Sequence, residues 1–144
     1  ILGGSGWETK STPANVRKLG HVGTNDHNAF FSSSLATLNV NRDSMAKYGF
    51  SPPTRVFEAI GAGACLITDE WKGIDFFLEP GREVLIASSG TEVVEHLQAL
   101  TPARAHAIAE RARVRILAHH TYAQRARQFN QLLEGMSRNI EAAE

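Results

Sequence analysis

Arg55 and Glu58 are three residues apart in the stretch SPPTRVFEAIGAGACLITD, residues 51–69. Because an α-helix makes one turn in about 3.6 residues, this spacing puts both side chains on one side of a helix. A guanidinium beside the free amides of a helix N-terminus suits a phosphate. A carboxylate one turn further along can accept hydrogen bonds from a sugar hydroxyl. These residues therefore indicate a binding site for a phosphorylated sugar or nucleotide, with Thr54 in the first helical turn. The alternative is an Arg55–Glu58 ion pair within the helix, which contributes a few tenths of a kcal/mol.

The same stretch predicts the elements that would position these side chains. Ser51 is the expected N-cap, and the prolines at positions 52 and 53 fit a first turn because neither has to donate an amide hydrogen there. The glycines at 61 and 63 predict the end of the helix. The apolar run 64–68 then predicts a strand that is covered on both faces.

Short apolar and amphipathic segments alternate along the rest of the chain. Further strands are expected at 1–2, 16–22, 35–40 and 84–87, and further helices around 29–31 and 74–78, from Thr91 to 100, from 101 to about 117, and after Thr121. Residues 45–50 are expected to form a loop. This alternation predicts an α/β fold: a Rossmann-like, three-layer α/β/α arrangement with a mostly parallel sheet. Residues 1–144 are expected to form a single domain, with C-terminal helices in 101–144.

Two further places could contact a ligand. Gly3 and Gly4 follow a short apolar segment, and glycines there would allow the backbone to approach a ligand closely. The pattern is not GxGxxG, so a plain strand exit is the alternative. Arg42 follows the expected strand 35–40, at the carboxyl end, where ligands of open α/β sheets bind. A salt bridge is the alternative role for Arg42.

Composition excludes several classes of function. The 15 basic and 15 acidic residues cancel, so no nucleic-acid partner is indicated. Cys65 is the one cysteine, which excludes an internal disulfide and fits a reducing cytoplasm. No apolar run reaches the length of a transmembrane segment. His119 and His120 are adjacent, so their side chains diverge on a helix, and a break in the helix is favoured over a metal site. The chain begins with Ile1 in a strand pattern, and we expect it to be part of a longer protein.

Four motifs together resemble one known family. They are LNVNR (38–42), PPTRVFEAIGAGACLITD (52–69), FFLEPGREVLIA (76–87) and IAERARVRILAHHTYAQR (108–125). Over about residues 20–127 the chain resembles the CgeB-like, spore-maturation-type members of the group 1 glycosyltransferases. The resemblance implies a two-domain GT-B enzyme, of which this chain would be the C-terminal half that binds the nucleotide-sugar donor. An N-terminal domain would then supply most of the site for an unknown acceptor, and the chain alone would not transfer sugar.

The resemblance also assigns roles to individual residues. Group 1 enzymes carry an E-x7-E element whose second Glu binds the donor ribose, and Glu58 matches it. The first Glu falls at Phe50 and is therefore absent, which leaves Thr54 and Arg55 as candidates beside the diphosphate and sugar. Gly3 and Gly4 match the family's glycine-rich first loop loosely. Arg55 would be the catalytic group: together with the helix amides it would stabilise charge on the leaving diphosphate, with no metal and no cofactor.

Two other functions fit parts of the pattern. A Rossmann-like nucleotide binder with different chemistry is one, although the sequence has no GxGxxG. A non-catalytic GT-B relative that acts as a scaffold or partner-binding module is the other, and the loss of the first Glu is compatible with it.

Overall fold

The computed structural model describes residues 1–141, which contain a three-stranded parallel sheet with the order β1-β2-β3. β1 (Thr37–Asn39) pairs with β2 (Leu66–Thr68), and β2 pairs with β3 (Leu85–Ile86). The register aligns Asn39 with Thr68 and Thr68 with Ile86. Because the pairing is parallel, the three strands end at the same edge of the sheet.

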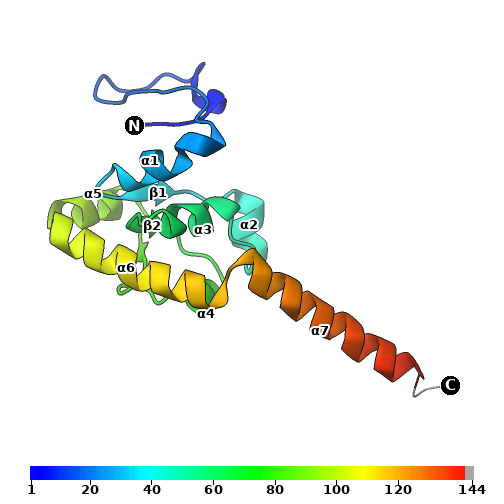
Figure 1. Ribbon diagram of the computed structural model, residues 1–144. Helices are drawn as coiled ribbons and strands as arrows, with labels where there is room; N and C mark the ends of the chain where they lie inside the picture. The colour runs from blue at the N-terminus through cyan, green and yellow to red at the C-terminus, as the bar shows by residue number, and fades with distance from the viewer. Residues whose placement is uncertain (142–144) are drawn as a thin grey trace.

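Helices connect and surround these strands (Figure 1). Two short 3-10 helices are η1 (Ser5–Trp7) and η2 (Thr24–Asp26). The α-helices are α1 (His27–Ser32), α2 (Asp43–Tyr48), α3 (Thr54–Gly61), α4 (Ile74–Phe77), α5 (Gly90–Ala99), α6 (Pro102–His119) and α7 (Tyr122–Glu141).

The central strand β2 is buried on both faces, as its apolar sequence predicts. Leu66 belongs to a core cluster with α3 and the C-terminal half of α6, whereas Ile67 belongs to a second cluster with β3 and the N-terminal half of α6. Successive side chains of a strand point to opposite faces, so these clusters lie on opposite sides of the sheet. The predicted α/β fold, with helices on both sides of a parallel sheet, is confirmed.

The first 23 residues lie outside this sheet, beyond α1 (Figure 1). The strands predicted at 1–2 and 16–22 are wrong as members of the sheet, since they form only one isolated parallel bridge, between Leu2 and Lys18. Its hydrogen bonds run from Leu2 N to the Arg17 carbonyl (2.8 Å) and from Leu19 N to the Leu2 carbonyl (2.9 Å). Glycines and polar residues flank both segments, so little apolar surface is present to extend the pairing.

Three local predictions are corrected by the structure. Residues 43–48 form α2 rather than part of a loop. The N-cap of α3 is Pro53, not Ser51, because consecutive prolines hold the preceding residues extended and put the Ser51 hydroxyl out of reach of the first turn. The N-cap of α5 is Ser89 rather than Thr91, and its hydroxyl accepts a hydrogen bond from Glu92 N at 3.2 Å.

The C-terminal helices follow the sequence pattern. Thr101 caps α6, which buries an apolar stripe that includes residues 105, 108, 109 and 112. The helix ends at His119, and His120 leaves the helical conformation. Thr121 then begins α7 with a reciprocal pair: its amide donates to Gln124 Oε1 (2.7 Å), and its Oγ1 accepts from Gln124 N (3.4 Å). In Figure 1, α7 extends away from the rest of the chain.

Candidate functional site

Buried polar side chains meet at the carboxyl edge of the sheet. Asn39 is the last residue of β1 and Thr68 the last of β2, and both are completely buried. Asn39 Nδ2 donates to Thr68 Oγ1 at 3.0 Å and to Asn41 Oδ1 at 3.2 Å. Polar groups buried in a sheet are unfavourable unless paired. This pairing fixes the ends of the two strands relative to one another.

The network continues into the loops that leave the sheet. Asp69 Oδ1 accepts hydrogen bonds from Asn41 N (3.0 Å) and from Thr68 Oγ1 (3.2 Å). Asn39 Oδ1 is buried and has no hydrogen-bond partner among the residues described. The loops after β1 and β2 are therefore held together at the edge where ligands of open α/β sheets bind.

The predicted residues of α3 point away from the core. Val56, Ala59 and Ile60 are buried, and Thr54, Arg55 and Glu58 are exposed. Because α3 lies in the crossover between the parallel strands β1 and β2, its N-terminus is at the carboxyl edge of the sheet. No side chain caps that N-terminus. Three residues of the predicted site thus share the solvent side of a helix that starts at this edge.

Glu58 is paired with a histidine rather than with Arg55. His27 Nδ1 lies 4.0 Å from Glu58 Oε2, and the side chains are 34% and 48% exposed. The Val22 carbonyl can only accept a hydrogen bond, so the 3.2 Å contact with His27 Nε2 requires a proton on Nε2, and the ion pair with Glu58 forms when Nδ1 is protonated as well. The Arg55–Glu58 ion pair, which the sequence offered as the alternative to a binding role, is not among the ion pairs of the described residues. The two residues are 31 positions apart, so no local pattern in the sequence indicates this contact.

The glycine-rich segment 3–6 packs on Val22, the residue whose carbonyl contacts His27. A side chain at Gly3 would put its Cβ 2.8 Å from Val22 Cγ2 and 3.0 Å from Phe30 Cζ, so only glycine fits there. Gly4 has a φ of 118° and donates to the Gly20 carbonyl at 2.5 Å. Gly3 therefore packs on Val22 and Phe30, the residues on either side of His27 in the sequence. The structure gives both glycines a packing and pairing role in the N-terminal segment.

Arg42 is the N-cap of α2 and lies three residues beyond the end of β1. Its carbonyl accepts from Met45 N (2.9 Å) and Ala46 N (3.1 Å), and its side chain is exposed. The salt bridge considered for Arg42 is not among the ion pairs of the part of the chain that the structure describes. Arg42 follows Asn41, whose amide is held by Asp69, so the start of α2 is fixed to the carboxyl edge of β2.

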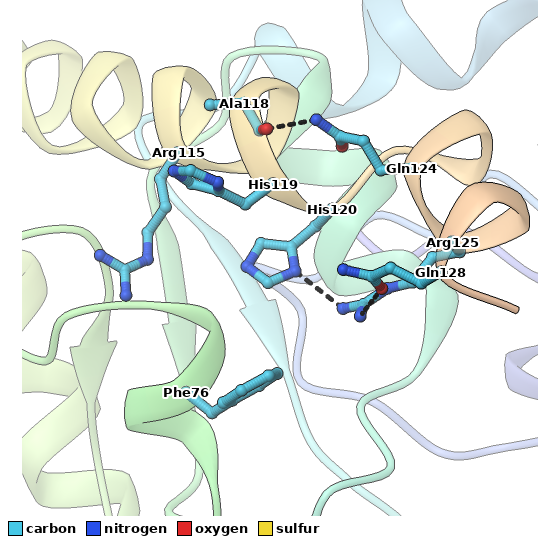
Figure 2. Close-up of a pocket in the computed structure, with 8 residues that line it drawn as sticks. All are labelled: Phe76, Arg115, Ala118, His119, His120, Gln124, Arg125 and Gln128. Carbon is cyan, nitrogen blue, oxygen red and sulfur yellow. Dashed lines mark hydrogen bonds between the residues drawn. The ribbon is translucent and has the colours of Figure 1, made fainter. Parts of the chain in front are cut away.

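A pocket of about 370 Å³ lies elsewhere, between α4, α6 and α7 (Figure 2). Its lining residues are Phe76, Arg115, Ala118, His119, His120, Gln124, Arg125 and Gln128.

The cations of this pocket are engaged within the protein. Arg125 donates to His120 Nδ1 at 2.8 Å and to Gln128 Oε1 at 3.1 Å. Arg115 donates to the Phe77 carbonyl at 3.0 Å and lies 3.5 Å from Glu83 Oε2. Burial, together with the positive charge of Arg125, lowers the pKa of His120. Arg125 thus joins α7 to the end of α6, and Arg115 joins α6 to α4. None of the predicted site residues lines the pocket.

The chemistry available at the carboxyl edge is that of hydrogen bonds and charge. Within residues 1–141, no group of three or more His, Cys, Asp or Glu side chains could hold a metal ion. No helix of that range is long and apolar enough to cross a membrane. Burial raises the pKa of the Cys65 thiol to about 11, so it is not a nucleophile near neutral pH. Arg42, Arg55 and Glu58 are exposed charged residues at or near the start of α2 and α3, the helices that begin at this edge.

The parallel sheet, the flanking helices and the terminal helix pair define the Rossmann-like half of a GT-B fold. The chain belongs to the Glycosyl transferase-like family, whose pattern it matches over residues 1–131. No curated protein matches the chain. Among solved structures it is similar to sucrose-phosphate synthase from Thermosynechococcus elongatus, with a TM-score of 0.68 and 20% sequence identity. The similarity covers 90% of this chain but 31% of that one, so the chain spans about a third of the length of this structural relative.

Proposed function

We propose that this chain is the donor-binding domain of a group 1, GT-B glycosyltransferase of the CgeB-like type. The donor would be a nucleoside diphosphate sugar, bound at the carboxyl edge of the sheet beside the start of α3. One observation carries the proposal: α3, which begins at the carboxyl edge of the sheet, buries Val56, Ala59 and Ile60 and leaves Arg55 and Glu58 exposed. Membership of the Glycosyl transferase-like family supports the reaction class.

Each exposed group has a role that its chemistry suits. Glu58 accepts hydrogen bonds from the ribose hydroxyls, and its contact with His27 keeps the carboxylate on the outer side of α3. The amides at the start of α3, with Thr54 and Arg55, face the diphosphate. Arg42 adds a positive charge at the end of β1. Gly3 and Gly4 would approach the donor from the N-terminal segment, where Gly3 packs on Val22 and Phe30.

Sugar transfer breaks the bond between the anomeric carbon and the diphosphate, and negative charge builds on the leaving group. Arg55 and the helix amides stabilise that charge more in the transition state than in the ground state. This route requires no metal and no cofactor. Residues from a second, N-terminal domain provide the acceptor site, and the enzyme acts in the cytoplasm. The 144-residue chain by itself then binds donor but does not transfer sugar.

The test is a titration of the chain with UDP, GDP, ADP and dTDP, followed through backbone amide shifts by NMR. Saturable shifts at Thr54, Arg55 and Glu58 with one nucleotide are expected. Glu58→Gln removes the charge that the ribose hydroxyls need and should weaken binding about tenfold or more, since a hydrogen bond to a charged group contributes about 1.5–3 kcal/mol. Glu95→Gln, on the exposed side of α5, is the matched control and should bind as the wild type does.

The outcomes separate the possible functions. Shifts centred on α6 and α7 would move the site to the pocket of Figure 2 and overturn the proposed site. No shifts with any of the four nucleotides up to ~1 mM would mean a binding free energy weaker than about −4 kcal/mol. That result would favour a non-catalytic scaffold. Binding that is unaffected by Glu58→Gln and by Arg55→Ala would show a nucleotide binder that uses other residues.

A further inference from the structure

Phe50 has an unusual backbone conformation. Its φ is 49°, and it is the one non-glycine residue with positive φ in the described part of the chain. Aromatic residues disfavour this left-handed region, because Cβ crowds the backbone there. Burial does not account for it, since Phe50 is 58% exposed. Strained residues of this kind persist where the surroundings hold them, and they cluster at binding sites.

The residues around Phe50 hold it in place. Phe50 N donates to the Lys72 carbonyl at 2.7 Å. The ring lies on Gly73, where any Cβ would overlap with it. Gly49, with a φ of 70°, is just as constrained: a Cβ there would lie 2.6 Å from Lys72 Cβ and 2.7 Å from the Lys72 carbonyl oxygen. Two glycines therefore allow the end of α2 to dock on the segment after β2, with an aromatic ring at the contact.

This ring sits on the loop that leaves the carboxyl end of β2. Lys72 and Gly73 follow Asp69, the residue that ties the ends of β1 and β2 together. Lys72 Nζ is 5.9 Å from the centroid of the Phe50 ring. An exposed aromatic ring with an ammonium group over it can contact a ligand that carries both a ring and a negative charge.

We infer that Phe50 is a stacking platform for a ring of the nucleotide-sugar donor, with Lys72 beside it for the phosphate charge. The inference rests on the proposed function and deepens it, because it assigns a residue that selects the donor. Both the base and the sugar of such a donor present a ring face, so either ring can stack on Phe50. A stacking contact depends on the ring face and tolerates a hydroxyl group at the edge of the ring. Tyr should therefore be able to replace Phe50, whereas Gly should not.

Phe50→Gly is the decisive variant, because glycine adopts the observed φ without strain and removes only the ring. It should unfold at the same temperature as the wild type or higher, yet bind the donor about tenfold more weakly, as expected for one lost stacking contact. Phe50→Tyr should bind within about threefold of the wild type. Phe129→Ala, which removes a 61%-exposed ring from α7, is the control and should leave binding unchanged.

Affinities are measured by calorimetry with UDP, GDP, ADP and dTDP and with the glucose conjugate of each. A Phe50→Gly loss that is equal for the diphosphate and its conjugate assigns the platform to the nucleoside. A loss confined to the conjugate assigns it to the sugar. If wild type and Phe50→Gly bind the same ligand equally, the platform is overturned and the proposed function stands. If the wild type binds none of the eight probes, the proposed function fails, and the inference with it.

Discussion

His27 Nδ1 lies 4.0 Å from Glu58 Oε2, and this contact joins the start of α1 to the outer side of α3. The opposite ring nitrogen of His27 contacts the Val22 carbonyl, so the imidazole bridges the N-terminal segment and the helix. A carboxylate on a helix surface samples several rotamers unless a partner limits them. His27 is therefore placed to orient the side chain that the proposed function assigns to the ribose.

We predict that His27→Ala weakens nucleotide binding by about three- to tenfold, because Glu58 loses its orienting contact. In a double-mutant cycle, His27→Ala should add little to Glu58→Gln, since both changes remove the same interaction. The affinities are measured by calorimetry with the nucleotide that binds the wild type. His21→Ala, which truncates an exposed histidine of the same segment, is the control. Additive losses would mean that His27 acts independently of Glu58.

A second prediction concerns the buried network at the end of the sheet. Thr68→Val keeps the shape of the side chain but removes the hydroxyl that accepts from Asn39 and donates to Asp69. The unpaired buried groups should lower the free energy of unfolding by about 1–3 kcal/mol in urea denaturation. Thr37→Val, at the other end of β1, is the control and should have a much smaller effect. Equal stability of the two variants would contradict a role for the network.

The sequence predicted most of the core elements, because their signals are local. The apolar run 64–68 and the glycines after α3 specified the central strand, and the stripe on α6 specified its buried face. The sequence did not predict α2, because this helix has only six residues and shows no clear apolar stripe. The prediction of two N-terminal strands was wrong for a related reason. The sequence pattern indicates an extended segment but not whether a neighbouring strand is available to pair with it.

The candidate site was predicted in part. Thr54, Arg55 and Glu58 were found because their spacing along one helix is visible in the sequence. His27 and Phe50 acquire their roles from contacts with residues that are distant in sequence, Glu58 and Gly73. The Asn39–Thr68 hydrogen bond likewise depends on strand register, which is a tertiary property. Contacts of this kind leave no periodic pattern, and only the fold reveals them.

A third prediction tests the docking of Phe50 on Gly73. Gly73→Ala adds a Cβ that overlaps with the Phe50 ring, at a φ of 90°. Gly81 has a similar φ of 78° and open space around it, so Gly81→Ala measures the backbone strain alone. We expect Gly73→Ala to be more destabilising than Gly81→Ala by about 1–3 kcal/mol in urea denaturation. Phe50→Gly should abolish this difference, because the overlapping ring is gone. A difference that persists in Phe50→Gly would assign the destabilisation to another contact.

The last prediction concerns the pH dependence of stability at the junction of α6 and α7. The pKa of His120 is lowered by burial first and by the positive charge of Arg125 second, with smaller contributions from His119 and Arg115. The Arg125 guanidinium donates to His120 Nδ1, and that hydrogen bond requires the neutral ring. As pH falls through about 6.5, His120 is protonated in the unfolded chain but stays neutral in the folded protein. This contribution to the free energy of unfolding is therefore complete above about pH 6.5 and decreases below it.

His120→Gln should flatten this dependence, because the amide oxygen can still accept from Arg125 but does not titrate. The free energy of unfolding, measured in urea at pH 8 and pH 5, should fall less for His120→Gln than for the wild type. His106→Gln, on the exposed side of α6, is the control and should retain the wild-type dependence. If wild type and His120→Gln lose equal stability between the two pH values, the acid sensitivity arises from other groups and the neutral His120–Arg125 contact is not its source.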